Sequence, residues 1–416
     1  MICRWLVAIC ALGACGGNDA TTDAGVEVDA SPFGAPSDTY PASSVHVPMS
    51  ATLGGPVMTN VRVVPIYYAD YAAKTALDDF YGKFAASPYW LQMVSEYAVA
   101  GNLTVATSVQ LPQNAPPTLS DADVKALLTS QLDGTHAEYG PVDSATLART
   151  IYSIHVPGTT VGTGPSPGLT SCVNFVGYHG ATSGTNRIIY SIVYDCLTPS
   201  YLSSTLELVT AAVSHELVEA ATDPISAMYA WTGLYMIDKP WGLAYGNELG
   251  DLCEGLTSNW FKPAEVGYMI QRSWSNASMH AFHNPCVPVP AAEQVFYASV
   301  PNGVDQVSVP DPGGGISMTP GTVIQLGKQG TVELQLLSSG PTEDWTIEAV
   351  DDHHVVTGGA PILTFAFDRA TGRNGNLVHL SITPVTRPTS GYALYRVVSH
   401  LGTTKTLWWG IVGITP

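Results

Sequence analysis

The sequence predicts an α/β domain with a mixed sheet, followed by an all-β, Ig-like sandwich. In the first two-thirds of the chain, short runs rich in β-branched and aromatic residues alternate with helical patterns, which favours an α/β layer. From about residue 300, seven short alternating or apolar runs are separated by Gly, Pro, Asp and Thr turns. Such spacing is typical of an Ig-like sandwich. We therefore assign residues 45–290 to the α/β domain and 300–416 to the sandwich.

Length and charge restrict the class of protein. The 416 residues suffice for two or three domains with cores of their own. Only 12% of residues are charged and the chain has 40 Gly and 30 Pro, which fits a secreted, loop-rich protein. A net charge of −18 argues against nucleic acid as a partner, because phosphates would repel the chain. No basic amphipathic run indicates binding to an anionic membrane surface.

The N-terminus reads as an export signal. Residues 1–14 hold one arginine, an apolar run and then small residues, and the run is too short for a membrane-spanning helix. LGAC, ending at Cys15, resembles the lipobox of bacterial lipoproteins, in which the cysteine is lipidated. An ordinary signal peptide with a chance cysteine is the alternative. Gly16 in place of Asp implies, by that resemblance, an outer-membrane or cell-surface protein. Residues 15–44 lack hydrophobic periodicity and are predicted to form a flexible tether.

Four cysteines remain beyond Cys15. An even number in an oxidising compartment predicts two disulfides, with three possible connectivities. We favour Cys172–Cys196 and Cys253–Cys286, because each pair brackets a single irregular segment. A zinc site built from all four is the alternative, but no CxxC spacing supports it.

The elements of the first domain follow in order. Residues 60–70 predict a buried strand, and 73–86 and 87–99 predict helices separated at Ser87-Pro88. Ser120 is the expected N-cap of a helix that reaches about Leu132, with acidic residues in its first turn. Two further strands are predicted at 146–156 and 187–195.

A helix over residues 201–222 carries the most informative motif. Apolar residues recur at steps of three and four, which predicts one buried face, and Pro224 ends the helix. His215 and Glu219 fall on the other side, one turn apart. The residues of the apolar face are Leu206, Val209, Val213, Leu217 and Ala220.

The motif SHELVEAATDP, at 214–224, reads HExxE where a zinc peptidase reads HExxH. A metal needs two ligands at i and i+4, here His215 and Glu219, with Glu216 placed to act on bound water. We therefore interpret the helix as zincin-like; the alternative is a helix with ordinary polar residues. A ligand set of one histidine with carboxylates has more hard oxygen donors than the usual set of two histidines and one carboxylate. We therefore expect Zn²⁺ first, with Mn²⁺ or Ca²⁺ as alternatives.

Four blocks in order resemble the phosphate-induced protein 1, or EXORDIUM-like, family over residues of about 55–287. They are NVRVVPIYYADY, VGYHG, SHELVEAATDP and the pair NELGDLCEG with GYMIQRSWSNASMHAFHNPCV. The resemblance implies a secreted or cell-wall protein connected with growth, and it leaves the chemistry to the residues. Matched positions are His179, His215, Glu216, Glu219, Glu248 and Asp251. Asp223 matches a position that also accepts Asn, which favours a supporting or helix-end role over a ligand.

The third metal ligand has to come from beyond the helix. We expect Glu248 or Asp251 to ligate the ion and the other to hold His215 or the loop that contains VGYHG. Glu254 is a weaker candidate for a ligand, because Cys253 and Gly255 indicate a turn that already leaves the site. His179 would orient substrate, stabilise an oxyanion or ligate the metal, and an ordinary loop histidine is the alternative.

Two functions remain in view. One is an exported, lipid-anchored, metal-dependent hydrolase, a zincin-like metallopeptidase with Glu216 as general base and a peptide or protein substrate. The other is a non-catalytic surface protein that binds wall polysaccharide or a partner and has a structural or vestigial metal site. In both, the membrane is met only through the N-terminal lipid.

Overall fold

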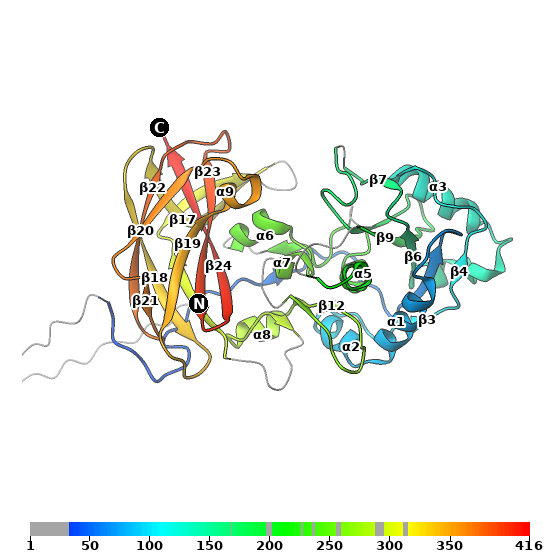
Figure 1. The fold of residues 1–416 in the computed structure, drawn as a ribbon, viewed down its shortest axis with the longest axis horizontal. Coiled ribbons are helices and arrows are strands. Elements are labelled where there is room, and N and C mark those ends of the chain that lie inside the picture. Colours follow the sequence, from blue (N-terminus) through cyan, green and yellow to red (C-terminus); the bar gives the residue numbers. More distant parts are fainter. Residues whose placement is uncertain are drawn as a thin grey trace, which may run out of the picture.

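The structure is a computed structural model in which two bodies lie side by side (Figure 1). The predicted signal at residues 1–14, Cys15 and the predicted tether up to residue 32 lie outside the described residues. Those described are 33–166, 168–196, 202–225, 228–234, 238–254, 259–287, 295–310 and 315–416.

The α/β body is built on a mixed sheet with the strand order β3-β2-β6-β9-β8, and β4 also pairs with β2. All neighbours are parallel except β8, which runs antiparallel to β9 at one edge. The predicted strands are confirmed as β2, β6 and β9. Bounds are β2 Arg62–Tyr67, β3 Thr104–Val105, β4 Val109–Gln110, β6 Thr150–Val156, β8 Gly177–Ala181 and β9 Ile189–Tyr194.

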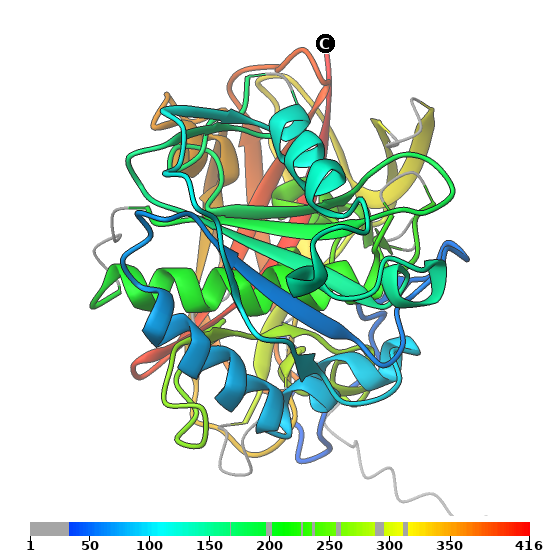
Figure 2. The same cartoon turned by 90° about the vertical axis from the view of Figure 1, so that its right-hand side faces the viewer.

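Helices cover both faces of this sheet (Figure 2). Val63 packs in one core with α1 (Lys74–Ala86), α2 (Tyr89–Val94) and α5 (Thr205–Thr222), whereas Val64 packs in a second core with α3 (Asp121–Gln131). Adjacent residues of a strand point to opposite faces, so a strand buried on both sides reads as a continuous apolar run. The predicted cap of α3 is confirmed, because the Ser120 side chain accepts from the backbone N–H of Asp123.

Helix α5 lies between the sheet and the rest of the body and is enclosed along most of its length. Ser204 caps its N-terminus, three residues later than the predicted start, and Asp223 is its C-cap. Val209, Val213, Leu217 and Ala220 are buried as expected, but so are Leu208, Ala211 and the polar residues of the motif. A helix apolar on most of its circumference is a core helix.

The C-terminal body has two facing sheets, in the orders β15-β18-β22-β20 and β16-β17-β24-β23-β19-β21. Seven of these strands correspond in chain order to strands A to G of an Ig-like sandwich: β15, β18, β19, β20, β22, β23 and β24. One sheet then holds A, B, E and D, and it faces the sheet that holds C, F and G. All seven predicted strands are present, and β15, β16 and the short β21 are additional. Bounds are β15 Tyr297–Asn302, β16 Asp305–Pro310, β17 Ile316–Gln325, β18 Gly330–Ser338, β19 Trp345–Asp351, β20 Leu363–Phe367, β21 Thr371–Gly372, β22 Leu377–Pro384, β23 Tyr392–Leu401 and β24 Thr404–Thr415.

Short elements complete the fold. They are β1 Ser50–Ala51, β5 Thr118–Ser120, β7 Val161–Thr163, β10 Gly233–Leu234, β11 Trp260–Phe261, β12 Ile270–Gln271, β13 Ser273–Trp274, β14 Cys286–Val287, the helices α4 Ser144–Leu147, α6 Lys239–Tyr245, α7 Asp251–Glu254, α8 Asn276–His280 and α9 Asp352–Thr357, and the 3₁₀ turns η1 Ser95–Tyr97 and η2 Ala137–Tyr139. Among the described residues, no helix has the length and apolar content that crossing a bilayer requires.

Both predicted disulfides are present, Cys172–Cys196 and Cys253–Cys286. They fit an oxidising, extracellular environment.

Residues 33–44, which we assigned to the tether, run along the sandwich. Leu377 N–H donates to Phe33 O at 2.7 Å and Ser37 N–H donates to Asn374 O at 2.9 Å. The Asn374 amide donates in turn to Ser37 O and Thr39 O, both at 2.8 Å. This part of the chain is therefore paired with the sandwich.

One apolar core joins the two bodies. It combines Trp241, Leu252 and Trp274 of the first body with Phe296 and Trp408 of the sandwich. Trp274 is fully buried, and its carbonyl accepts from Tyr97 Oη at 2.7 Å. The sandwich thus buries the side of the first body that carries α7.

We predict that Trp274→Ala lowers the free energy of unfolding by about 3–5 kcal/mol, because a fully buried indole leaves a cavity that the joint cannot close. Urea denaturation followed by far-ultraviolet circular dichroism measures the loss. Leu53→Ala, at a side chain that is 62% exposed, is the control and should change stability by less than about 0.5 kcal/mol. A loss below about 1 kcal/mol for Trp274→Ala would show that the joint contributes little.

Candidate metal centre

Three elements bring acidic and histidine side chains together. Helix α5 presents His215, Glu216 and Glu219, and edge strand β8 presents His179. The segment that enters α7 adds Glu248, Asp251 and Glu254. Three groups have donor atoms within 4.8 Å of one another: His179, Glu219 and Glu248; His215, Glu216 and Glu219; and His215, Asp251 and Glu254.

Glu219 belongs to two of these groups, as His215 does. Its Oε1 accepts from the backbone N–H of Gly250 at 3.0 Å and of Asp251 at 3.2 Å. Its Oε2 lies 3.0 Å from His215 Nε2 and 3.7 Å from His179 Nδ1. One carboxylate oxygen therefore holds the α7 segment, and the other faces both histidines.

His179 reaches the cluster from β8, which we had predicted as part of a loop. The pairing His179↔Ser191 with β9 fixes its place on the sheet edge. Its Nε2 lies 3.2 Å from Asp223 O and 3.4 Å from Glu248 Oε1, and its Nδ1 lies 3.4 Å from Glu216 Oε2. With Nε2–H turned to the Asp223 carbonyl, Nδ1 faces the cluster, as a donor while His179 is protonated and as an acceptor once that proton is lost.

Asp223 supports the cluster through its backbone carbonyl and through its side chain. Its carbonyl faces His179, while its side-chain Oδ1 accepts from Ala230 N–H at 2.7 Å. As the C-cap of α5 it fixes the chain where the helix ends. No group of potential metal ligands among the described residues includes it.

Glu254 lies with the cluster, contrary to our expectation that the chain leaves the site there. Its carboxylate groups with those of His215 and Asp251. The reason is that Asp251–Glu254 form a helical turn, which brings residues three apart to the same side. The spacing D-x-x-E was the signal that sequence reasoning missed.

Glycine backbone closes on the cluster from two directions. A Cβ on Gly250 would lie 2.6 Å from His215 Nδ1 and 2.7 Å from Glu219 Oε1. A Cβ on Gly177, in β8, would lie 2.9 Å from Glu216 Oε1. Only glycine permits these approaches without displacing the side chains of the motif.

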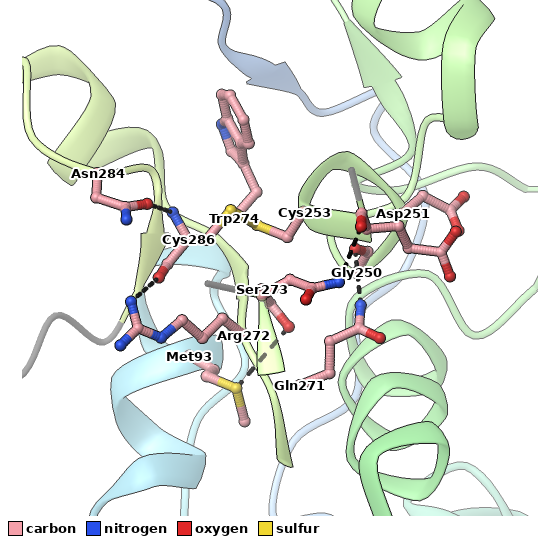
Figure 3. The surroundings of a disulfide bond; sticks show 12 residues. Met93, Gly250, Asp251, Cys253, Gln271, Arg272, Ser273, Trp274, Asn284 and Cys286 are labelled. Atoms are coloured by element: carbon pink, nitrogen blue, oxygen red, sulfur yellow. Dashed lines mark hydrogen bonds between the residues drawn. A yellow bond between two sulfur atoms is a disulfide. The ribbon is translucent and has the colours of Figure 1, made fainter. Parts of the chain in front are cut away.

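The strands that follow the α7 segment in the chain hold it in place (Figure 3). Gln271 Nε2 donates to Gly250 O at 2.9 Å, and Gln271 N–H donates to Ser214 Oγ at 2.9 Å, next to His215. Trp274 N–H donates to Leu249 O at 2.8 Å, and the Cys253–Cys286 disulfide ties α7 to β14. The segment that carries three carboxylates is thus fixed at several points.

The charges of the cluster do not balance. Burial works to lower the pKa of His179, but the carboxylates of Glu248, Glu216 and Glu219 outweigh it and raise that pKa to about 10. Burial likewise opposes protonation of His215, yet Glu219 and Glu216 raise its pKa well above the usual value. Partial burial raises the pKa of Glu248 to about 8, and burial with Glu219 raises that of Asp251 well above its usual value. Carboxylates exceed histidines, so a divalent cation would relieve the repulsion.

Comparison with known proteins adds no functional information. No protein-family model and no curated protein matches the chain. Among solved structures it is similar to titin domain M3, with 16% identity over 23% of this chain and 88% of that one and a TM-score of 0.16. It is similar to titin domain M7 with 13% identity over 28% of this chain and 96% of that one and a TM-score of 0.16. It is also similar to the twitchin kinase region from C. elegans, with 14% identity over 29% of this chain and 16% of that one and a TM-score of 0.18. At these TM-scores the likenesses add nothing to the strand topology described above.

We predict that Gly250→Ala destabilises the protein by about 1–3 kcal/mol. The added methyl group has to displace His215 or Glu219, and Glu219 Oε1 then loses backbone donors inside a buried site. Thermal and urea unfolding measure the change. Gly82→Ala is the matched control, since its Cβ on α1 would meet nothing within 4 Å and should stabilise by up to about 1 kcal/mol. Equal stability of the two variants would contradict the close packing of Gly250.

Proposed function

We propose that this chain is an exported, lipid-anchored, metal-dependent hydrolase, most simply a zincin-like metallopeptidase in which Glu216 is the general base. One observation carries the proposal. The HExxE face of a buried helix meets a histidine from the sheet edge and a carboxylate segment from beyond the helix. These are donor types that bind zinc in catalytic sites.

The spacing of the donors supports an ion held by His215 and Glu219. With metal–ligand bonds of about 2.0–2.1 Å in a tetrahedron, two ligand atoms lie about 3.3 Å apart. His215 Nε2 and Glu219 Oε2 are separated by 3.0 Å, and Glu219 Oε2 and His179 Nδ1 by 3.7 Å. Asp251 Oδ1, at 3.8 Å from His215 Nε2, and Glu248 are the other candidates for the third ligand.

The surplus of carboxylates bears on the choice of ion. Zn²⁺ is the first choice because imidazole nitrogen is among the donors. Mn²⁺ and Ca²⁺ are the alternatives, since both accept oxygen-rich sites.

Glu216 has the position of a base. Its Oε2 is buried and lies 3.4 Å from His179 Nδ1, and it has no hydrogen bond of good geometry with any residue that the structure describes. A bound ion would supply Lewis acidity and a more acidic water. The Glu216 carboxylate would accept the proton of that water, and the edge of β8 would present the peptide substrate beside it.

A second candidate is a non-catalytic surface protein with a closed, structural metal site. The observation that favours it is that Glu216 itself groups with His215 and Glu219, and so could complete the coordination of the ion. A structural site is closed by protein ligands, whereas a catalytic site keeps a position for water. Its partner would be wall polysaccharide or another protein.

We predict that Glu219→Ala weakens Zn²⁺ binding by at least about 100-fold, because it removes a ligand and releases the α7 segment. Isothermal titration with zinc measures the affinity. Glu248→Ala, Asp251→Ala and His179→Ala, measured in parallel, identify the third ligand by the largest loss. Glu265→Ala, at an exposed turn, is the control. Unchanged zinc affinity in Glu219→Ala would exclude this site.

We predict that Glu216→Gln lowers peptide hydrolysis by at least about 100-fold and leaves the zinc content unchanged, because a general base serves water and does not hold the ion. Cleavage of a peptide library read by mass spectrometry, together with elemental analysis, gives both quantities. Loss of zinc from this variant would favour the closed structural site, and full activity would rule out Glu216 as the base.

We predict that Cys15→Ser moves the protein from membrane to soluble fractions, since it removes the acylation site of the lipobox. Fractionation of cells with immunodetection tests this. Cys15 lies outside the described residues, so circular dichroism of the variant serves to compare its fold with that of the wild type. Membrane association that persists in the variant would show that the anchor is not at Cys15.

A further inference from the structure

A cavity of about 220 Å³, separate from the candidate metal centre, lies where the two bodies meet. Three parts of the chain line it: residues 45–48 after the N-terminal segment, the start of α6, and the sandwich. None of the side chains of the metal centre contributes to its wall. Its chemistry is set by His46, Asp238, Trp241, Gln335, Trp408 and Trp409.

Three tryptophans belong to the apolar part of this wall, which aliphatic residues and prolines complete. Trp241, Trp408 and Trp409 are all at least nine-tenths buried, so their orientation is fixed by packing. Trp241 and Trp408 meet edge to face with centroids 5.5 Å apart, and the Arg396 guanidinium lies 4.9 Å from the centre of the Trp409 ring. An indole face carries negative charge density and attracts weakly positive C–H groups.

The polar part centres on a buried carboxylate. Asp238 is only 3% exposed; its Oδ1 lies 2.7 Å from His46 Nε2, and its Oδ2 accepts from Met49 N–H at 3.1 Å. A carboxylate has about four lone-pair positions, so two hydrogen bonds leave capacity for further donors. Asn302 and Gln335 are also among the lining residues, and their side-chain amides have both donors and acceptors, although Gln335 Oε1 already accepts from Ser43 Oγ at 3.2 Å.

Size and charge restrict the ligand. The cavity is smaller than the roughly 300–1,000 Å³ of pockets that enclose drug-sized ligands, so it takes one ring and not an extended chain. Asp238 and the net charge of −18 disfavour anions. A neutral ring with C–H groups on one face and hydroxyl groups around its rim matches both parts of the wall.

We propose that this cavity binds a single neutral pyranose ring, either as a free monosaccharide or as the terminal residue of an oligosaccharide. The C–H face of the sugar packs on the indoles, and its hydroxyls donate to Asp238 and exchange hydrogen bonds with Gln335 and Asn302. The inference does not depend on the metal centre, and the two can fail separately.

Titration of the purified protein with single sugars tests the proposal. Glucose, galactose, mannose and N-acetylglucosamine serve as probes, with chitobiose to represent a terminal residue. Saturation-transfer NMR detects the bound ring, and we expect a Kd of about 1 mM for the best sugar, as for other ligands of a dozen heavy atoms. A chitobiose Kd at or below that of N-acetylglucosamine indicates a terminal residue, and a weaker one a free monosaccharide.

Two variants locate the binding. Asp238→Asn should weaken it about tenfold, since hydrogen bonds to a charged acceptor are the strong ones. Gln335→Ala should weaken it several-fold while leaving the buried wall intact. Asp368→Asn is the matched control, because Asp368 also pairs with a histidine, His379, at 2.6 Å on the sandwich but does not line the cavity. Circular dichroism confirms that each variant is folded.

Three results would overturn the inference. One is the absence of saturation transfer to every sugar at concentrations up to about 50 mM, well above the expected Kd. Another is sugar binding that neither variant changes, which would place the sugar elsewhere on the surface. The third is tighter binding of a proline-rich peptide than of any sugar, with that peptide binding lost in Asp238→Asn. Aromatic walls also accept polyproline, so this result would identify a different ligand.

Discussion

The Glu219 carboxylate links helix α5 to the segment that enters α7, two of the three elements that form the candidate metal centre. Through Oε1 it accepts the backbone N–H groups of Gly250 and Asp251, and through Oε2 it faces His215 and His179. A buried carboxylate with two backbone donors and a histidine neighbour is stabilised in its charged form, and its pKa is lowered even though burial acts to raise it. The segment that brings Asp251 and Glu254 is thereby set against the helix.

The rest of the fold keeps that contact in place. Helix α5 is rigid because the sheet packs on one side of it and apolar side chains from the following strands enclose the other. The α7 segment is held by Gln271, by the carbonyl of Leu249 and by the Cys253–Cys286 disulfide (Figure 3). The sandwich covers α7 from outside through the joint core around Trp274 and Trp408. The C-terminal body thus acts as part of the support of the site, which explains why the two are packed so extensively.

Much of this arrangement was readable from the sequence, and the exceptions have physical causes. Long periodic segments, such as α5 and the strands of the sandwich, gave strong signals. β15 and β16 were missed because each contains a proline, which weakens a strand pattern, and β8 because two of its five residues are glycine. One of these glycines matters to the site, since Gly177 lets Glu216 approach the sheet. The disulfides were predicted because each pair brackets one irregular segment. Which carboxylate joins which histidine depends on tertiary contacts that no local pattern encodes.

Elemental analysis of the wild-type protein tests the central claim most directly. The protein would be expressed from residue 33, the first that the structure describes, incubated with excess ZnCl₂ and freed of unbound ion by gel filtration. The account predicts one zinc ion per chain, because the two histidines and the carboxylates around them bring enough donor atoms together to hold a single ion. Zinc at background level after this loading, with Mn²⁺ and Ca²⁺ equally absent after the same treatment, would contradict it.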